Sequence, residues 1–317
     1  MFHPLRGVVP PVSTPFTPEL SIDTSSLSRL VDHLLNGGVH GLFALGSTSE
    51  AAFLTDQHRD TVVATIVERA ADRVPVVAGV IDMTTLLVVE HIRRAKDLGA
   101  QGIVATAPFY TRTHPVEIRR HYELIKEAAG DLPVYAYDLP VSVGTKLDAV
   151  EVLPLLEEGI LAGVKDSSGS DAGLRALILG AQEKNLHDVS LLTGSELTVD
   201  GALLYGASGV VPGLGNVDPA GYVRLWEACQ EGDYGRARAE QERLFRMFGL
   251  VNVAAGNRMG RGSSALGAFK AALKLLGLID CALTAPPYVP LSNEEIAAIV
   301  PYLREAGLTP SEHDPQA

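Results

Sequence analysis

The sequence predicts a (β/α)8 TIM barrel, an α/β fold, with a C-terminal helical appendage. Eight short apolar runs alternate with longer stretches that carry the helical spacing of apolar residues. The short runs are nearly continuous in Val, Ile, Leu and Ala, which is typical of parallel strands buried on both faces. An open doubly wound sheet is disfavoured, because no Gly-x-Gly-x-x-Gly motif follows the first run.

The predicted strands are the apolar runs themselves, each bounded by glycine, proline or polar residues. They lie near Gly7–Pro11, Gly41–Leu45, Val74–Ile81, Gly102–Thr106, Val134–Tyr137, Leu161–Lys165, Val189–Thr193 and Gly209–Pro212. A helix is expected after each one. The first begins at Asp23 and stops at Gly37-Gly38, and Thr55 caps the second. The next five are Thr84–Leu98, Pro115–Ala129, Asp148–Glu157, Asp171–Glu183 and Leu197–Leu204.

The eighth strand is followed by more helix than a barrel needs. Asp218 is a suitable N-cap, and Pro219 suits the first helical position. Helical patterns then cover most of residues 219–278 and 293–306. We therefore expect residues 1–218 to form the (β/α)8 barrel, and residues 219–317 to supply C-terminal helices packed on it, including its last helix.

Composition limits the classes of function. With 46% hydrophobic and 20% charged residues, the 317-residue chain has ample core for a globular protein. A formal net charge of −12 argues against nucleic acid or an anionic membrane as partner. Two cysteines, Cys229 and Cys281, supply no disulfide framework. No apolar run approaches the ~18 residues of a membrane span. A cytoplasmic location is expected.

Lys165 is the most informative single residue. It ends a buried strand and is followed at once by the polar residues Asp166, Ser167 and Ser168. A lysine has an ordinary pKa of about 10.4, and desolvation lowers it by disfavouring the charged form. The neutral amine can then attack a carbonyl carbon to form a Schiff base. The alternative is a structural lysine whose stem is buried while its amine reaches Asp166 or another carboxylate.

Active sites of such barrels lie at the carboxyl ends of the strands. The second strand ends in Gly46-Ser47-Thr48-Ser49-Glu50, whose hydroxyls and backbone N–H groups could bind a carboxylate, or simply cap the next helix. The fifth strand ends at Tyr137, which is either a proton donor and acceptor or a core aromatic. Together with Lys165, these groups suit 2-oxo acids.

At these residues the chain resembles the dihydrodipicolinate synthase/N-acetylneuraminate lyase superfamily of Schiff-base aldolases. The resemblance extends over residues 5–306 and rests on ordered agreement at the strand ends. The matching stretches are Gly46–Glu50, Pro108–Tyr110, Tyr137–Pro140, Gly163–Gly169, Gly206–Val211 and the late prolines Pro286, Pro287 and Pro290.

The resemblance implies the role of each residue. Pyruvate would be attached to Lys165, with Tyr137 transferring protons and Tyr110 extending a hydroxyl relay, in many relatives across a subunit contact. The remaining candidates would bind substrate. Ser47 and Thr48 would bind the pyruvoyl carboxylate, and the Val211 backbone would lie against the pyruvate. A polyhydroxy chain would be bound by Ser167, Gly194, Ser195 and Glu196. It also implies a homotetramer or homodimer.

Departures from the family pattern bear on the substrate. Dihydrodipicolinate synthases carry an arginine that binds the carboxylate of aspartate semialdehyde, and Ser142 stands at that position here. Losing such a charge-assisted contact is costly. Two further departures are Ser49 for the usual glycine and Asp138 for asparagine. We therefore expect a pyruvate-dependent carbon–carbon lyase acting on a 2-keto-3-deoxy sugar acid or related 2-oxo acid. The alternatives are 4-hydroxy-tetrahydrodipicolinate synthase and a dehydratase of the same superfamily.

No metal or organic cofactor is expected, because the iminium itself accepts the electrons. A metal-dependent aldolase would need His, Asp or Glu clustered at strand ends. The histidines fall mostly on helices and loops instead, among them His33, His58, His91, His121 and His187. The glycine-rich stretch Gly209–Gly215 could hold phosphate, but no lysine or arginine lies beside it in the sequence.

Overall fold

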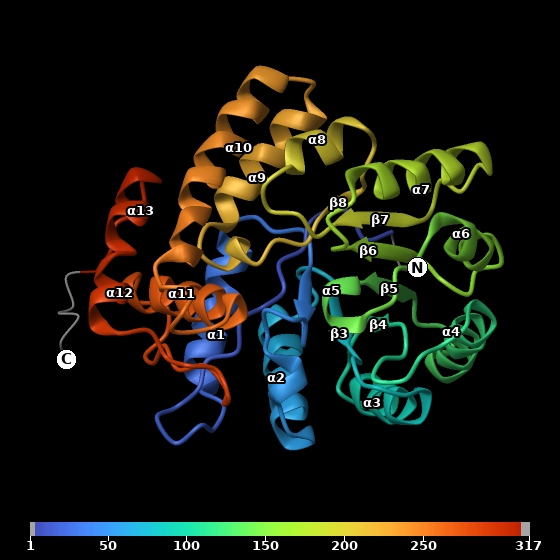
Figure 1. The fold of residues 1–317 in the computed structure, drawn as a ribbon, viewed down its shortest axis with the longest axis horizontal. Helices are drawn as coiled ribbons and strands as arrows, with labels where there is room; N and C mark the ends of the chain where they lie inside the picture. The colour runs from blue at the N-terminus through green and yellow to red at the C-terminus, as the bar shows by residue number, and fades with distance from the viewer. Residues whose placement is uncertain (1–3, 312–317) are drawn as a thin grey trace.

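The computed structural model describes residues 4–311 and contains one eight-stranded parallel sheet (Figure 1). Strands that follow one another along the chain are neighbours in space from β2 to β8, and β8 pairs with β1. The extension of β1 also reaches β2: Pro11 pairs with Phe43, and the Val12 N–H donates to Phe43 O at 2.9 Å. The sheet therefore closes, and the predicted (β/α)8 barrel is confirmed.

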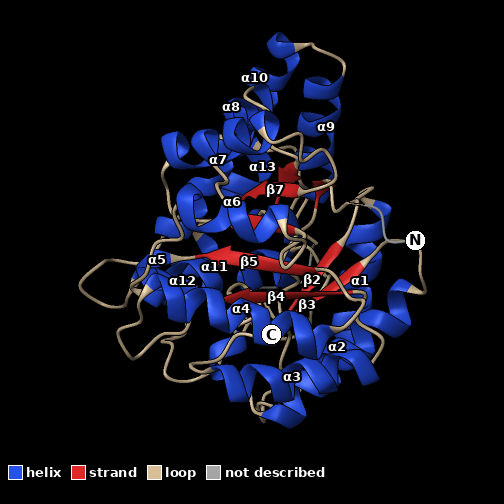
Figure 2. Ribbon diagram, turned by 90° about the vertical axis from the view of Figure 1, so that its right-hand side faces the viewer, coloured by secondary structure: helices blue, strands red, loops and turns tan. Residues whose placement is uncertain are grey.

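All eight strands form where the apolar runs predict them. They are β1 (Gly7–Val8), β2 (Leu42–Ala44), β3 (Val76–Gly79), β4 (Gly102–Thr106), β5 (Val134–Asp138), β6 (Gly163–Asp166), β7 (Ser190–Thr193) and β8 (Gly209–Val210). Several are shorter than their apolar runs, because only the paired residues belong to the strand. Figure 2 shows the strands in the centre with helices around them.

A helix follows each strand, and the predicted caps are present. The barrel helices are α1 (Thr24–Asn36), α2 (Asp56–Ala70), α3 (Thr85–Asp97), α4 (Pro115–Ala129), α6 (Ala149–Glu157), α7 (Asp171–Glu183), α8 (Val199–Leu204) and α9 (Pro219–Gln230). Asp23 accepts from the Ser26 N–H at 2.9 Å, and Asp218 accepts from the Gly221 N–H at 2.9 Å. A short helix after β5, α5 (Pro140–Val143), was not predicted.

The C-terminal appendage is helical, but it is interrupted more often than its sequence pattern indicates. It comprises α10 (Tyr234–Phe248), α11 (Arg261–Leu275), α12 (Asn293–Ala297) and α13 (Val300–Glu305). Gly232, at φ +74°, turns the chain between α9 and α10. Because α9 packs against both β1 and α10, the boundary between residues 218 and 219 stays a prediction.

The core has two parts, and the smaller one lies inside the barrel. The larger part fills the space between the sheet and its helices. The inner part is made by side chains that point toward the barrel axis: Leu5, Val9, Phe43, Val77, Val104, Tyr135, Tyr137, Leu192 and Val211. Lys165 alternates with the outward-packed Val164 on β6, so its side chain also points inward.

Candidate active site

Lys165 lies inside the barrel among aromatic rings. Its side chain is buried, and its Nζ lies 4.1 Å from the centroid of the Tyr137 ring and 5.0 Å from that of Phe43. Among residues 4–311, no carboxylate forms an ion pair with Lys165. The reading of Lys165 as a lysine that reaches Asp166 at the surface is therefore not supported. An amine in these surroundings is shielded from water and open to an electrophile.

Tyr137 is the neighbour of Lys165 on the next strand. The two residues are Cα partners in the β5–β6 pairing, so both side chains point into the barrel at the same height. The Tyr137 hydroxyl lies 3.2 Å from Ser47 Oγ. Burial raises the pKa of Tyr137. The charge of Lys165 and the hydroxyls of Ser47 and Ser167 together lower it by more, so the pKa lies below its ordinary value. Proton release from this phenol is thereby favoured.

The loop after β2 carries Ser47 and Thr48 toward the same end of the barrel. Ser49 fixes this loop: its hydroxyl donates to Val12 O and accepts from the Gly46 N–H at 3.0 Å. The backbone of Ser49 does not have a positive φ, whereas that of Glu50 does, at +60°. Replacing the usual glycine by Ser49 therefore introduces no left-handed strain and adds two hydrogen bonds.

Ser167 and Gly194 lie against each other across the β6 and β7 ends. A Cβ built on Gly194 would overlap Ser167 Oγ, so a larger residue there would displace the Ser167 hydroxyl. The Ser195 hydroxyl instead pairs with Thr198 Oγ1 at 3.0 Å. Gly194 and Ser195 line a small cavity of about 120 Å³ together with Asp166 and Ser167. The structure thus places Ser167 close to Tyr137, and directs Ser195 to the start of α8.

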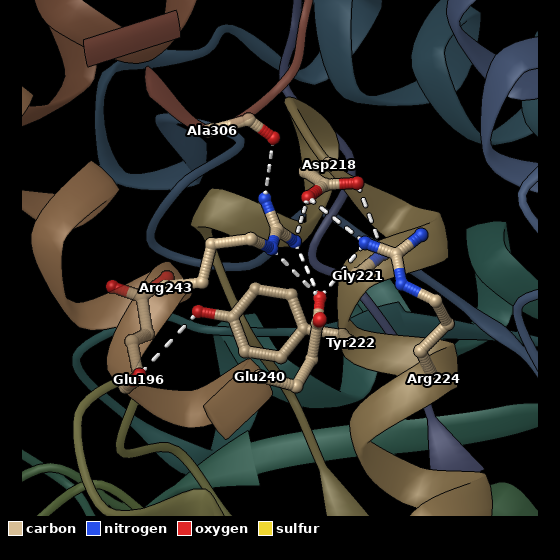
Figure 3. A network of polar contacts seen from close by, with 8 residues as sticks. All are labelled: Glu196, Asp218, Gly221, Tyr222, Arg224, Glu240, Arg243 and Ala306. Carbon is tan, nitrogen blue, oxygen red and sulfur yellow. Dashed lines mark hydrogen bonds and ion pairs between the residues drawn. The ribbon is translucent and has the colours of Figure 1, made fainter. Parts of the chain in front are cut away.

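Glu196 is held by one backbone N–H group and two side chains. Its carboxylate accepts from the Leu214 N–H, and its backbone carbonyl accepts from Gln241 Nε2 at 3.1 Å. The same carbonyl accepts from Tyr222 Oη at 3.5 Å (Figure 3). Burial raises the pKa of Glu196 to about 7, against the lowering effects of the Leu214 N–H and the Lys165 charge. Glu196 is therefore a carboxyl group that changes charge near neutral pH.

Thr48 and Glu196 approach the same point of the β8 loop. A Cβ on Gly213 would stand 3.1 Å from Thr48 Oγ1 and 3.1 Å from Glu196 Oε1. Val211 is buried in the inner core with Tyr137, and its N–H donates to Thr193 O at 2.8 Å. Glu196 is also near enough to Lys165 for the lysine charge to act on its carboxyl group.

Tyr110 does not lie with the candidate residues around Lys165 and Tyr137. It follows β4 with φ at +73°, and its side chain is 91% exposed. No hydrogen bond joins its hydroxyl to another side chain of the described residues. Within one chain, Tyr110 is directed to the surface rather than toward Lys165.

Two features of the site were missed at the sequence level. Phe43 forms an aromatic wall, with its ring edge-on to Tyr137 at 6.4 Å between centroids. Its position on an inward face of β2 could have revealed it. Asp138, which replaces the family's asparagine, is buried and pairs with Lys146, while the Leu147 N–H donates to it at 3.1 Å. Only the spacing of Asp138 and Lys146 around the short α5 hinted at this pair.

Other parts of the described chain offer no competing catalytic cluster. Within residues 4–311 no three His, Cys, Asp or Glu side chains gather in a way that could hold a metal ion. A cavity of about 760 Å³ opens at the opposite end of the barrel, lined by Leu5, His40, Pro75 and Pro133 among others, and contains none of the candidate residues. No helix of this part of the chain is both long and apolar enough to cross a membrane.

Comparison with known proteins identifies the family. Residues 4–306 match the model of the dihydrodipicolinate synthetase family. An uncharacterized DapA-like lyase of Halobacterium salinarum is 35% identical over 305 residues, covering 96% of this chain and 95% of the relative. The 4-hydroxy-tetrahydrodipicolinate synthase of Kineococcus radiotolerans is 30% identical over 313 residues, covering 98% and 96%.

Solved structures agree with this assignment. YagE, a prophage protein of the dihydrodipicolinic acid synthase family from Escherichia coli K12, was solved in complex with pyruvate. It superimposes with a TM-score of 0.88 at 28% identity, over 96% of this chain and 99% of YagE. The dihydrodipicolinate synthase of Bacteroides thetaiotaomicron gives 0.88 at 30% identity, over 96% and 99%. The chain therefore belongs to the dihydrodipicolinate synthetase family and is a carbon–carbon lyase of the dihydrodipicolinate synthase/N-acetylneuraminate lyase superfamily.

Proposed function

We propose that the protein is a Schiff-base-forming, pyruvate-dependent lyase that cleaves a 2-keto-3-deoxy sugar acid or a related 2-oxo acid. One observation carries this proposal: the buried Nζ of Lys165 lies 4.1 Å from the Tyr137 ring, and the Tyr137 hydroxyl lies 3.2 Å from Ser47. The residues that we propose as nucleophile, proton carrier and carboxylate-binding hydroxyl thus lie close together at one end of the barrel. YagE, a relative of known structure, binds pyruvate.

The first step is attack on the ketone. The lone pair of the neutral Lys165 amine adds to C2 of the 2-oxo acid, and the carbonyl oxygen becomes the hydroxyl of a carbinolamine. Ser47 and Thr48 bind the adjacent carboxylate and so hold C2 within reach of the amine. Tyr137 donates a proton to the departing hydroxyl, which leaves as water, and an iminium forms on Lys165.

The second step is cleavage of the C3–C4 bond. The Tyr137 phenolate takes the proton of the C4 hydroxyl, whose electrons form the aldehyde carbonyl. The electron pair of the C3–C4 bond becomes the C2=C3 double bond, and the π pair of the iminium moves onto nitrogen, which leaves an enamine of pyruvate. Protonation at C3 and hydrolysis then release pyruvate and the free amine. Burial raises the pKa of Tyr137, and the Lys165 charge with the neighbouring hydroxyls lowers it below its ordinary value. A lowered pKa suits this exchange of protons.

The loops after β5 and β7 support the proposed substrate class. Ser142 is exposed on α5, and the nearby Lys146 is committed to Asp138. The segment 138–147 therefore supplies no free cation for a second carboxylate. Ser167 and Glu196 offer hydroxyl and carboxyl groups instead, which suit the hydroxyls of a sugar-acid chain.

The two alternative activities, a synthase and a dehydratase, belong to the same superfamily. A 4-hydroxy-tetrahydrodipicolinate synthase would condense pyruvate with aspartate semialdehyde, and a relative that is 30% identical bears that name. The serine at position 142 weighs against it. A dehydratase would share the Lys165 iminium and differ only in the bond that breaks.

The protein is expected to work as a homo-oligomer, a tetramer or a dimer, in the cytoplasm. Tyr110 is almost fully exposed, and Met83, Leu86 and Leu87 are exposed at neighbouring positions after β3. Such a surface suits a subunit contact through which Tyr110 would enter the site of a second copy. Both cysteines, Cys229 and Cys281, are free, as expected in a reducing compartment.

Borohydride reduction in the presence of pyruvate tests the Schiff base. Reduction of the iminium fixes pyruvate to the protein, so we expect a covalent mass increase that peptide mapping assigns to Lys165. The Lys165→Ala variant, which should fold because the barrel core remains, serves as the control. Labelling at another lysine, or normal turnover by Lys165→Ala, would refute the assignment.

Coupled assays then distinguish the substrates. Pyruvate release from 2-keto-3-deoxy sugar acids, without turnover of aspartate semialdehyde, is the expected result. Condensation of pyruvate with aspartate semialdehyde would favour the synthase instead.

A further inference from the structure

A buried ion pair joins the C-terminal appendage to the loop that carries Ser47 and Thr48. Glu50 ends that loop, and Lys270 lies in the middle of α11; their side chains are 0% and 1% exposed. The ammonium of Lys270 contacts Glu50 Oε1 and donates to Leu283 O at 2.7 Å. The second carboxylate oxygen of Glu50 accepts from the Ala285 N–H.

Neither charge would be stable in this place without the other. Burial lowers the pKa of Lys270, and the Glu50 carboxylate raises it back in part. The Lys270 ammonium also lies 4.2 Å from the centroid of the Phe16 ring, in the loop after β1. Removing one partner of such a pair leaves an uncompensated buried charge, which must either take or lose a proton or move toward water.

The pair acts on a strained part of the backbone. Glu50 has φ +60° and ψ 27°, a left-handed conformation that a residue with a Cβ rarely adopts. Such a conformation persists only where surrounding contacts hold it. Those contacts are Lys270 and Ala285 on one side, and Ser49, bonded to Val12, on the other.

We propose that Glu50 and Lys270 are positioning residues, which set the place of the Ser47–Thr48 turn through the left-handed backbone of Glu50. This inference rests on the proposed function, since it assigns to that turn the binding of the pyruvate carboxylate. Helix α11, far from the strand ends in sequence, thereby becomes a support of the substrate-binding loop. The pair makes no contact with Lys165 or Tyr137.

A role limited to stability makes a different prediction. A pair that only stabilises the fold would, when altered, lower the melting temperature and leave substrate binding by the folded protein unchanged. A positioning pair would raise the pyruvate concentration needed for binding, while the chemistry at Lys165 still goes to completion.

The test measures borohydride labelling of Lys165 over a range of pyruvate concentrations, together with thermal melting. Glu50→Asp keeps both charges but shortens the reach to Lys270 by one methylene, so the turn must shift. We expect it to fold, to need roughly tenfold more pyruvate for half-maximal labelling, and to reach the full labelling of the wild type at saturation. Lys270→Met should show a larger increase.

A rescue variant and a matched control sharpen the result. In Glu50→Asp/Lys270→Arg the longer arginine can reach the shorter aspartate, so the pyruvate dependence should return most of the way to that of the wild type. Arg243→Met breaks another largely buried pair of the appendage, that with Asp218. It should lower the melting temperature without changing the pyruvate dependence.

Wild-type pyruvate dependence in Glu50→Asp would overturn the inference, whether or not Lys270→Met folds. So would an equal increase in Arg243→Met, since general loosening would then explain the effect. Labelling of the wild-type protein at Lys165 would, in either case, leave the proposed function standing. Absence of that labelling would overturn both.

Discussion

In the proposed mechanism, protons move between the substrate and the Tyr137 phenol, so we expect Tyr137 to be the most sensitive side chain after Lys165. We predict that Tyr137→Phe lowers kcat by about 10²- to 10⁴-fold, because the hydroxyl serves both dehydration and C–C cleavage. Pyruvate binding should change far less, since Ser47 and Thr48 remain. Steady-state kinetics on a 2-oxo acid substrate check this split. Equal losses in kcat and in pyruvate affinity would contradict the proton-transfer role.

Glu196 should make stability depend on pH. Burial raises its pKa from 4.5 to about 7 in the folded protein, so folding favours the protonated carboxyl. The contribution of Glu196 to the free energy of unfolding is fully present below pH 4.5 and is lost as the pH rises through about 7.

We therefore predict that Glu196→Gln, which cannot ionise, gains stability relative to the wild type as the pH rises from 4.5 to about 7. Urea unfolding at several pH values measures this difference. A difference in unfolding free energy that does not vary with pH would show that Glu196 titrates at its ordinary value.

At the scale of elements, the start of α9 depends on one carboxylate. Asp218 caps the helix through the Gly221 N–H and pairs with Arg243 of α10 (Figure 3). Arg243 in turn donates to Ala306 O at 2.9 Å, beyond the end of α13. A single side chain thus links the last barrel helix to two helices of the appendage.

We predict that Asp218→Ala destabilises the fold by about 2 kcal/mol, because it removes the cap and one of the two carboxylates that pair with Arg243, the other being Glu240. Asp218→Asn keeps an acceptor for the Gly221 N–H and should lose less. Denaturant unfolding of the two variants separates these contributions. Equal losses would show that the cap contributes little.

At the scale of the whole molecule, the exposure of Tyr110 leads to a prediction about how the subunits assemble. If the tyrosine serves a neighbouring copy, Tyr110→Phe and Lys165→Ala damage different halves of a shared site. We predict that mixing the two variants under subunit exchange restores part of the activity. A hybrid pair then contains one site with both an intact Lys165 and an intact Tyr110.

Activity assays before and after exchange, with sedimentation to establish the oligomer, check this prediction. No recovery from an exchanged mixture would mean that Tyr110 acts within its own chain or not at all. The division of the chain at residue 218 is a separate prediction, which expression of residues 1–218 alone would test.

The sequence by itself determined the barrel, the order of its strands and helices, and the group formed by Lys165, Tyr137 and the Ser47–Thr48 loop. It could do so because these features are local. Apolar runs and caps such as Asp23 and Asp218 can be recognised within a few consecutive residues. The carboxyl ends of parallel strands all lie at the same end of a barrel, so residues that follow them are brought together.

Only the tertiary structure decided which side chains turn toward Lys165 and which turn away. It directed Ser195 to Thr198, exposed Tyr110, and joined Glu50 to Lys270 across 220 positions of sequence. No local pattern encodes such contacts, because they depend on how the C-terminal helices pack on the barrel. Burial then sets the electrostatics, since the same Glu196 would keep an ordinary pKa in water.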